Sequence, residues 1–186
     1  MNLLEWFEKG LTFDEYKAQM KVNLDEMNSV YEQFQIGEEE KEELSSIKNV
    51  ASKVIVLTED WCGDALMNNA ILMKMAEDLQ LDVRFILRDS NLELMDQYLT
   101  NGTARSIPIF IFIDDQGNEK AVWGPRAQEA QNFVDSLRAE LPEKEAEDFE
   151  VKQKEMFKKV KETYMQDKNL WRAVAKSIIT KLKNER

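Results

Sequence analysis

The residue best suited to do chemistry in this chain is its one cysteine, Cys62. It follows a run of four apolar residues, 54–57, that predicts a short buried strand, and from Ala65 onward the spacing of apolar residues predicts a helix. The first N–H groups of a helix have no partners inside the helix and favour negative charge beside them. A thiolate, the reactive form of cysteine, is stabilised at such a turn. The pattern therefore predicts a nucleophilic cysteine where a strand becomes a helix.

The direction of the shift in the pKa of Cys62 is left open by the sequence. The helix start lowers this pKa, whereas three nearby carboxylates favour the protonated thiol. A small buried apolar residue is the alternative to a nucleophile, but the flanking Trp61 and Gly63 favour the nucleophile. The three carboxylates are those of Glu59, Asp60 and Asp64.

The strand-to-helix turn at Cys62 belongs to a longer stretch in which predicted strands and helices alternate. Because a strand–helix–strand connection is right-handed and makes a parallel pair, the first two strands should lie parallel. The turn at residues 115–118 should make the last two antiparallel. The expected order is strand 54–57, helix 64–79, strand 83–87, helix 92–98, loop 100–106, strand 109–113, strand 119–123 and helix 128–141. This order predicts an α/β fold with a central mixed four-stranded sheet flanked by helices.

Three motifs together resemble those of the thioredoxin family. Trp61-Cys62-Gly63 is similar to the start of the family's Trp-Cys-Gly-Pro-Cys site, and Arg105-Ser106-Ile107-Pro108 is similar to its cis-proline loop. The hairpin of residues 109–123, followed by a glycine, is the third. The resemblance covers about residues 48–140 and implies a thioredoxin-like fold with Cys62 as the catalytic nucleophile. The other residues that it places at the substrate site are Trp61, Gly63, Asp64, Ile107, Pro108 and Gly124.

Departures from the family pattern change the expected mechanism. Asp64 stands where the family has proline, and Ala65 stands in place of the second cysteine. The buried acid that thioredoxins carry six positions before the nucleophile is Val56 here, and the usual basic residue aligns near Phe85. Since Ala65 cannot resolve a mixed disulfide, an external thiol must release it. That thiol would be a small one, such as glutathione or bacillithiol, or one on a partner protein.

Two functions follow from these features. The first is a thiol–disulfide oxidoreductase that acts on a disulfide-containing protein or small thiol through Cys62 alone, with Arg105 and Arg126 as sources of positive charge. The second is a redox-inactive module that binds a protein or peptide. The reactivity of the thiol discriminates between them, because only a thiolate more reactive than free cysteine at pH 7 favours the oxidoreductase. The binding face of such a module would consist of Trp61, Ile107 and Trp123.

Composition favours a soluble cytoplasmic protein without a cofactor or a metal. Hydrophobic residues make up 43% of the chain and charged residues 33%, which is typical of globular domains. No apolar run approaches the ~20 residues of a transmembrane helix, and the first ten residues do not resemble a signal peptide. One cysteine and no histidine argue against a disulfide framework and a structural zinc site. A net charge of −11 argues against nucleic acid as a partner.

Helices are expected on both sides of the sheet-containing domain. Thr12 and Glu15 form a predicted capping box, from which a helix should continue to Phe34, and a third helix is expected over residues 38–49. Two more should follow Pro142. The expected parts are an N-terminal helical extension, 1–50, the thioredoxin-like domain, 51–141, and a C-terminal helical extension, 142–186.

The C-terminal extension is basic, whereas the rest of the chain is acidic. Residues 151–186 carry 11 Lys/Arg and 4 Asp/Glu, a net charge of +7, against −18 in the other 150 residues. Apolar residues from Leu170 to Leu182 repeat on one face of its second helix. Since both extensions have an apolar face to cover, we expect them to pack together or to exchange between the subunits of a homodimer. A separate acidic partner is the alternative.

Overall fold

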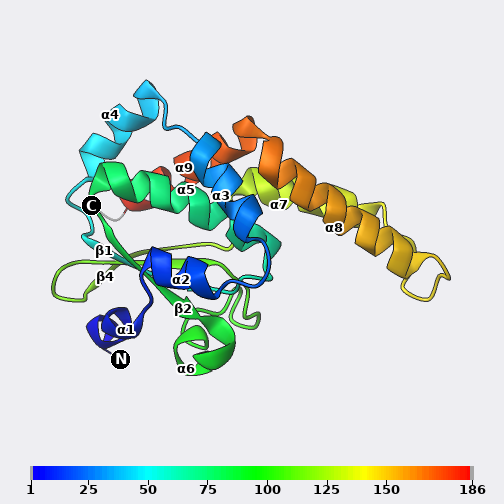
Figure 1. The fold of residues 1–186 in the computed structure, drawn as a ribbon, viewed down its shortest axis with the longest axis horizontal. Coiled ribbons are helices and arrows are strands. Elements are labelled where there is room, and N and C mark those ends of the chain that lie inside the picture. The colour runs from blue at the N-terminus through cyan, green and yellow to red at the C-terminus, as the bar shows by residue number, and fades with distance from the viewer. Residues whose placement is uncertain (1, 185–186) are drawn as a thin grey trace.

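The computed structural model describes residues 2–184, and its centre is a mixed four-stranded sheet (Figure 1). The strands are β1 (Lys53–Thr58), β2 (Asp82–Leu87), β3 (Ile109–Ile113) and β4 (Glu119–Trp123). They lie in the order β2-β1-β3-β4, with β1 parallel to β2 and antiparallel to β3, and with β3 antiparallel to β4. The predicted thioredoxin-like α/β fold is confirmed.

The two faces of the sheet bury separate sets of side chains, because successive residues of a strand point to opposite sides. Along β1, Val54 and Val56 join the larger core, and Ile55 and Leu57 join the smaller one. The larger core receives side chains from α3 (Leu24–Gln33), α4 (Glu38–Ile47), α5 (Gly63–Leu79), α7 (Gln128–Ala139), α8 (Phe149–Gln166) and α9 (Lys168–Lys183). The smaller core receives side chains from α1 (Leu3–Lys9), α6 (Leu92–Met95) and the first turn of α5.

The single helix predicted over residues 13–34 is wrong, because the structure divides it into α2 (Phe13–Gln19) and α3. Between them, the carboxylate of Asp60 accepts hydrogen bonds from the N–H groups of Lys21 and Val22 at 2.6 and 3.4 Å. Asn23 has a positive φ of 61° and donates its side-chain amide to the carbonyl of Asp60 at 2.8 Å. The turn before Cys62 therefore takes the backbone groups that a continuous helix would pair internally.

Smaller differences concern the ends of the predicted helices. α2 begins at the capping box of Thr12 and Glu15, as predicted. The helix expected over residues 92–98 is shorter, because the N–H groups of Gln97 and Tyr98 reach back only three residues and tighten the chain after α6. A 3-10 helix, η1 (Arg88–Ser90), precedes it.

The two helical extensions pack on each other and on the larger core. Trp171 of α9 is 1% exposed, and its ring meets that of Phe34 edge-to-face at 6.4 Å. Ion pairs join the basic C-terminal helices to the acidic N-terminal ones: Lys161–Glu26, Lys176–Glu39 and Lys183–Glu43. The larger core therefore draws on all three predicted parts of the chain, while their exact boundaries and an exchange between subunits of a homodimer stay predictions.

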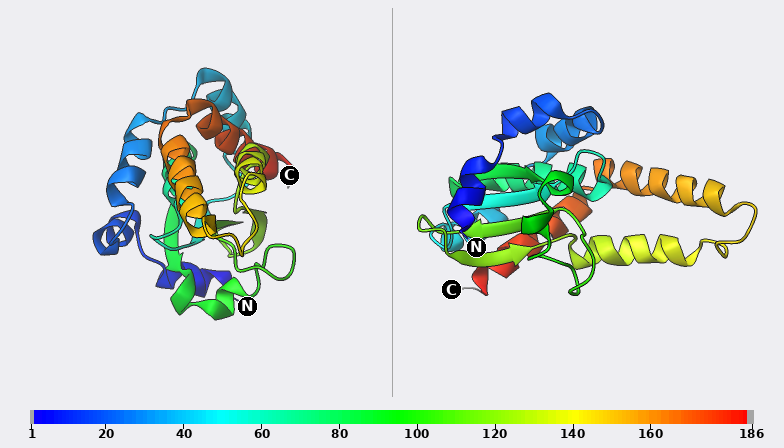
Figure 2. Two further views of the ribbon diagram at one scale, coloured as in Figure 1. Left: turned by 90° about the vertical axis from the view of Figure 1, so that its right-hand side faces the viewer. Right: turned by 90° about the horizontal axis from the view of Figure 1, so that it is seen from below.

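α7 and α8 run side by side and project from the rest of the chain as a helical arm (Figure 2). Residues 140–148 connect them at its far end. On α8, Tyr164 near the base is fully buried, whereas Val151 and Phe157 farther out are 57% and 55% exposed. None of the described helices is long and apolar enough to cross a membrane.

Candidate active site at Cys62

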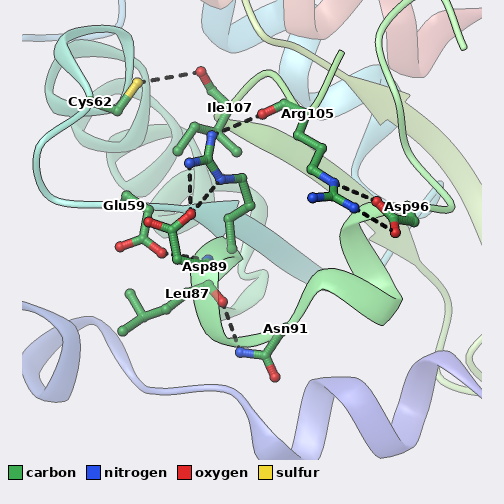
Figure 3. A network of polar contacts seen from close by, with 9 residues as sticks. Glu59, Cys62, Leu87, Asp89, Asn91, Asp96, Arg105 and Ile107 are labelled. Atoms are coloured by element: carbon green, nitrogen blue, oxygen red, sulfur yellow. Dashed lines mark hydrogen bonds and ion pairs between the residues drawn. The ribbon is translucent and has the colours of Figure 1, made fainter. Parts of the chain in front are cut away.

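Cys62 is the N-cap residue of α5 and lies at the strand-to-helix turn that the sequence predicts. Its N–H donates to the carbonyl of Glu59 at 3.3 Å, which closes the turn after β1. Figure 3 shows the sulfur turned toward Ile107, and the thiol donates to the carbonyl of that residue with an Sγ–O distance of 3.4 Å. Only 8% of Cys62 is exposed. The thiol therefore faces the loop before β3, as the resemblance implied.

Burial raises the pKa of the Cys62 thiol to about 11. The negative charge of Asp64 acts in the same direction, whereas the N–H groups of Ala65 and Asp64 and the positive charge of Arg126 lower this pKa. Desolvation therefore outweighs the helix start, which answers the question of sign that the sequence left open. The thiol is protonated in the resting protein at neutral pH.

Alkylation of Cys62 by iodoacetamide should therefore remain slow at pH 7 and rise about tenfold per pH unit up to about pH 10, because only the thiolate reacts. Glutathione in the same buffers is the reference, since the rate for an ordinary thiol levels off near its pKa of ~8.5. The Cys62→Ser variant gives the background. A protein rate that levels off by pH 8 would contradict the raised pKa.

The residue directly after β4, Gly124, packs closely against the loop before β3. The Ile107–Pro108 peptide is cis, as the resemblance to the cis-proline loop implied, and the Gly124–Pro125 peptide is a second cis bond. Gly124 has a φ of +127°, and a Cβ atom on it would lie 2.2 Å from the carbonyl oxygen of Pro108. Only glycine allows this approach. The structure thus brings Ile107, Pro108 and Gly124 together beside Cys62.

Gly63 and Trp61 line the accessible side of the turn. Apart from the adjoining backbone, no atom lies within 4 Å of the place that a Cβ atom on Gly63 would take, so the space beside this residue is open. The indole of Trp61 is 51% exposed. By contrast, the side chains of Ile107 and Trp123 are 4% and 5% exposed, and Trp123 stacks on Phe110. Of the binding face predicted for a redox-inactive module, only Trp61 therefore presents its side chain.

Arg88 connects the turn at Cys62 with the loop before β3. This role was not predicted from the sequence. Its guanidinium lies over the ring of Trp61, 4.8 Å from the centroid, and donates to the carbonyl of Arg105 at 3.0 Å. Asp89 pairs with it at 2.6 Å, and the carboxylate of Glu59 accepts from the N–H of Asp89 at 2.8 Å. Nothing in the sequence near Arg88 indicates this contact, because it depends on the fold.

The two arginines predicted as sources of positive charge at the site, Arg105 and Arg126, are both paired with carboxylates. Arg105 forms a bidentate pair with Asp96, at 2.7 and 2.9 Å (Figure 3). Arg126 forms one with Asp64, and both of its contacts are 2.7 Å long. Asp64 also accepts the hydroxyl of Tyr164 at 2.7 Å, and its side chain is 12% exposed. The carboxylate of Asp64, placed at the substrate site by the resemblance, is therefore engaged within the chain.

A buried polar cluster lies near the thiol, on the side of the sheet occupied by α5. Asn69 donates its amide to the hydroxyl of Thr58 at 3.0 Å, and the hydroxyl of Tyr16 lies 3.5 Å from the same oxygen. All three residues are at most 1% exposed. The signal that could have revealed this cluster is a pair of asparagines, residues 68–69, in an otherwise apolar stretch of helix. No group of three or more carboxylates and thiols among the described residues is placed to hold a metal ion.

The sequence matches the family model described as Thioredoxin over residues 10–138. Two solved structures are similar over the whole chain, each at 14% identity. One is a protein of unknown function from Pseudomonas aeruginosa, with a TM-score of 0.72 and coverage of 100% of this chain and 99% of that one. The other is an HIV epitope scaffold, with a TM-score of 0.70 and full coverage of both chains. At this identity the two structures show a shared fold alone. No curated protein matches this sequence.

Proposed function

Because this chain belongs to the thioredoxin family, we propose that it is a thiol–disulfide oxidoreductase that acts through Cys62 alone. The observation that carries the proposal is the position of the thiol, at the start of α5 and 3.4 Å from the carbonyl of Ile107, the residue before the cis proline. The half-exposed ring of Trp61 and the open space beside Gly63 support access of a substrate from this side.

The exchange runs in two balanced steps. The Cys62 thiolate attacks one sulfur of a disulfide R–S–S–R′, which forms Cys62–S–S–R and expels R′–S⁻, and this thiolate takes up the proton that Cys62 lost. An external thiol then attacks the mixed disulfide, leaves with R as a new disulfide and restores the Cys62 thiol. One external thiol, such as glutathione, bacillithiol or a thiol of a partner protein, thus frees R′ as a thiol and keeps R in a mixed disulfide. A second equivalent of that thiol attacks this disulfide, releases R as a thiol and leaves as the disulfide of the external thiol, so the two equivalents supply the two electrons of the reduction. This requirement favours a reducing compartment, the cytoplasm.

The raised pKa of Cys62 defines what a substrate must supply. At pH 7 only about one thiol in ten thousand is ionised when the pKa is near 11, compared with roughly 3% for a pKa of 8.5. Exchange with a small, freely diffusing disulfide should therefore be slow. A partner bound beside Trp61 raises the effective concentration of the reacting disulfide and offsets this deficit.

The test is to follow mixed-disulfide formation and turnover in parallel. Purified protein is incubated with glutathione disulfide at pH 7 and pH 9, and the Cys62 adduct is measured by intact-protein mass spectrometry. Reduction of a protein disulfide is then measured with and without added glutathione. We expect a single adduct that forms faster at pH 9, turnover only when glutathione is present, and neither in the Cys62→Ser variant. Turnover without any second thiol would refute the single-cysteine mechanism.

A second candidate, a redox-inactive module that binds a protein or peptide, is favoured by the burial of Cys62 and its raised pKa. Its binding face would retain the half-exposed Trp61, because the side chains of Ile107 and Trp123 are 4% and 5% exposed. The same experiment separates the two functions. A module of this kind would bind its partner equally well in the Cys62→Ser variant and would form no adduct with glutathione disulfide even at pH 9.

A further inference from the structure

Three segments far apart in the sequence meet on the carboxylate of Asp64, two residues after Cys62. Arg126, in the loop between β4 and α7, places Nε and Nη2 at 2.7 Å from its two oxygens, and Tyr164 of α8 donates its hydroxyl at 2.7 Å. Gln131 of α7 accepts from Nη1 of Arg126 at 3.0 Å. The side chains of Asp64 and Arg126 are 12% and 18% exposed. A bidentate pair so far removed from water is screened much less than a surface contact.

This ion pair lies at the start of the helix that presents the thiol. We propose that Arg126, supported by Tyr164, compensates the charge of Asp64 and thereby sets the reactivity of Cys62. The inference rests on the proposed function, because the thiol concerned is the nucleophile proposed there. Arg126 is then a positioning residue that acts through Asp64, and the C-terminal extension contributes to the site through Tyr164.

The two members of the pair act on the thiol in opposite directions. The negative charge of Asp64 raises the pKa of Cys62, and the positive charge of Arg126 lowers it. In the intact pair the charge of Arg126 offsets part of the effect of Asp64, which is the larger of the two. A neutral residue in place of Arg126 leaves the carboxylate alone and disfavours the thiolate, whereas a neutral residue in place of Asp64 leaves the guanidinium alone and favours it. Damage to packing would not produce effects of opposite sign.

Other titratable and charged groups near the thiol stay the same in such variants. Two acidic residues lie in the same turn, and two tyrosines come from α2 and α8, both with side chains in the larger core. Since the variants of Arg126 and Asp64 replace none of these groups, a difference between them reports on the ion pair itself. The groups are Glu59, Asp60, Tyr16 on α2 and Tyr164 on α8, with Arg88 of η1 over the neighbouring indole.

The test is the rate at which iodoacetamide alkylates Cys62 in the full-length protein, measured from pH 7 to pH 10. At pH 8, Arg126→Met should react about three- to tenfold more slowly than wild type, and Asp64→Asn about three- to tenfold faster. The double variant should lie within about threefold of wild type, because it lacks both charges. Arg126→Lys keeps the positive charge but loses the bidentate geometry, and because the effect on the thiol is one of charge its rate should also lie within about threefold of wild type. Tyr164→Phe should slow the reaction about twofold, since it removes one hydrogen bond from the carboxylate.

Circular dichroism and thermal melting of each variant establish that it is folded, and Asp64→Asn, which preserves size, keeps the test valid if Arg126→Met does not fold. Equal slowing in both single variants, or rates that do not differ from wild type across the pH range, would overturn the inference. Because alkylation needs no substrate, its outcome is independent of turnover. A protein that turns over no disulfide but shows the opposite shifts would refute the proposed function and leave this inference standing.

Discussion

A chain that ends at Pro142 should fail to fold or should aggregate. The truncation removes α8 and α9, and with them nine apolar or aromatic side chains that are each at most 7% exposed. Full burial of a Leu, Ile, Val or Met side chain contributes about 1.5–3 kcal/mol, so the sum is comparable to the whole stability of a domain, about 5–15 kcal/mol. The nine are Met156, Tyr164, Leu170, Trp171, Val174, Ala175, Ile178, Ile179 and Leu182.

The truncation also uncovers surfaces on the remaining chain. The indole N–H of Trp123 loses its acceptor, the hydroxyl of Ser177, and the ring of Phe34 loses its contact with Trp171. Thermal melting by circular dichroism and size-exclusion chromatography measure the outcome. Trp171→Ala is a milder form of the same change and should cost about 3–5 kcal/mol of unfolding free energy, since it leaves a cavity in the core.

Phe157→Ala is the matched control for the truncation, because this α8 side chain is 55% exposed and its loss should change the unfolding free energy by no more than about 0.5 kcal/mol. A truncated protein that stays soluble, monomeric and as stable as the full chain would contradict the expected result. It would indicate instead that the tail is a detachable binding segment and would favour a separate partner for it.

Local patterns were enough to predict the sheet and the turn that carries the thiol. The strands have period-two or fully apolar patterns, so their order along the chain could be deduced from neighbouring residues alone. The break between α2 and α3 could not, because the amides of Lys21 and Val22 are taken by Asp60, almost 40 residues later. Periodicity in residues 13–34 is helical throughout, and only the tertiary contact divides it.

The candidate site shows the same division between local and distant information. The motifs around Cys62, Ile107 and Gly124 were visible in the sequence and meet in the structure. The contact of Tyr164 with Asp64 spans 100 residues and has no local signal. The direction of the shift in the pKa of Cys62 could not be predicted from the sequence either. Burial is its largest cause, and burial depends on the packing of the whole fold.

Ala65→Cys should convert the site from one that needs an external thiol into one that resolves its own mixed disulfides. Position 65 lies in the first turn of α5, three residues after Cys62, and both residues belong to the smaller core. Two thiols at this spacing at a helix start come within bonding range. We expect a reversible intramolecular disulfide and a gain of activity in the reduction of insulin disulfides. Free-thiol titration before and after oxidation, together with the insulin assay, measures both.

The gain of reductase activity should be large, because Ala65→Cys adds the step that resolves the mixed disulfide, a step that the unsubstituted site cannot perform. In the unsubstituted chain a mixed disulfide persists until a second molecule attacks it, whereas a thiol at position 65 attacks it within the same site at a high effective concentration. Position 65 is 1% exposed, so the added sulfur should cost about 1–3 kcal/mol of stability through overpacking. Ala65→Ser, of nearly the same size but without a thiol, separates that cost from the chemistry and should show no gain. If oxidation yields no disulfide in a folded Ala65→Cys protein, the turn at Cys62 differs from that of thioredoxins, and the proposed exchange would have to use another geometry.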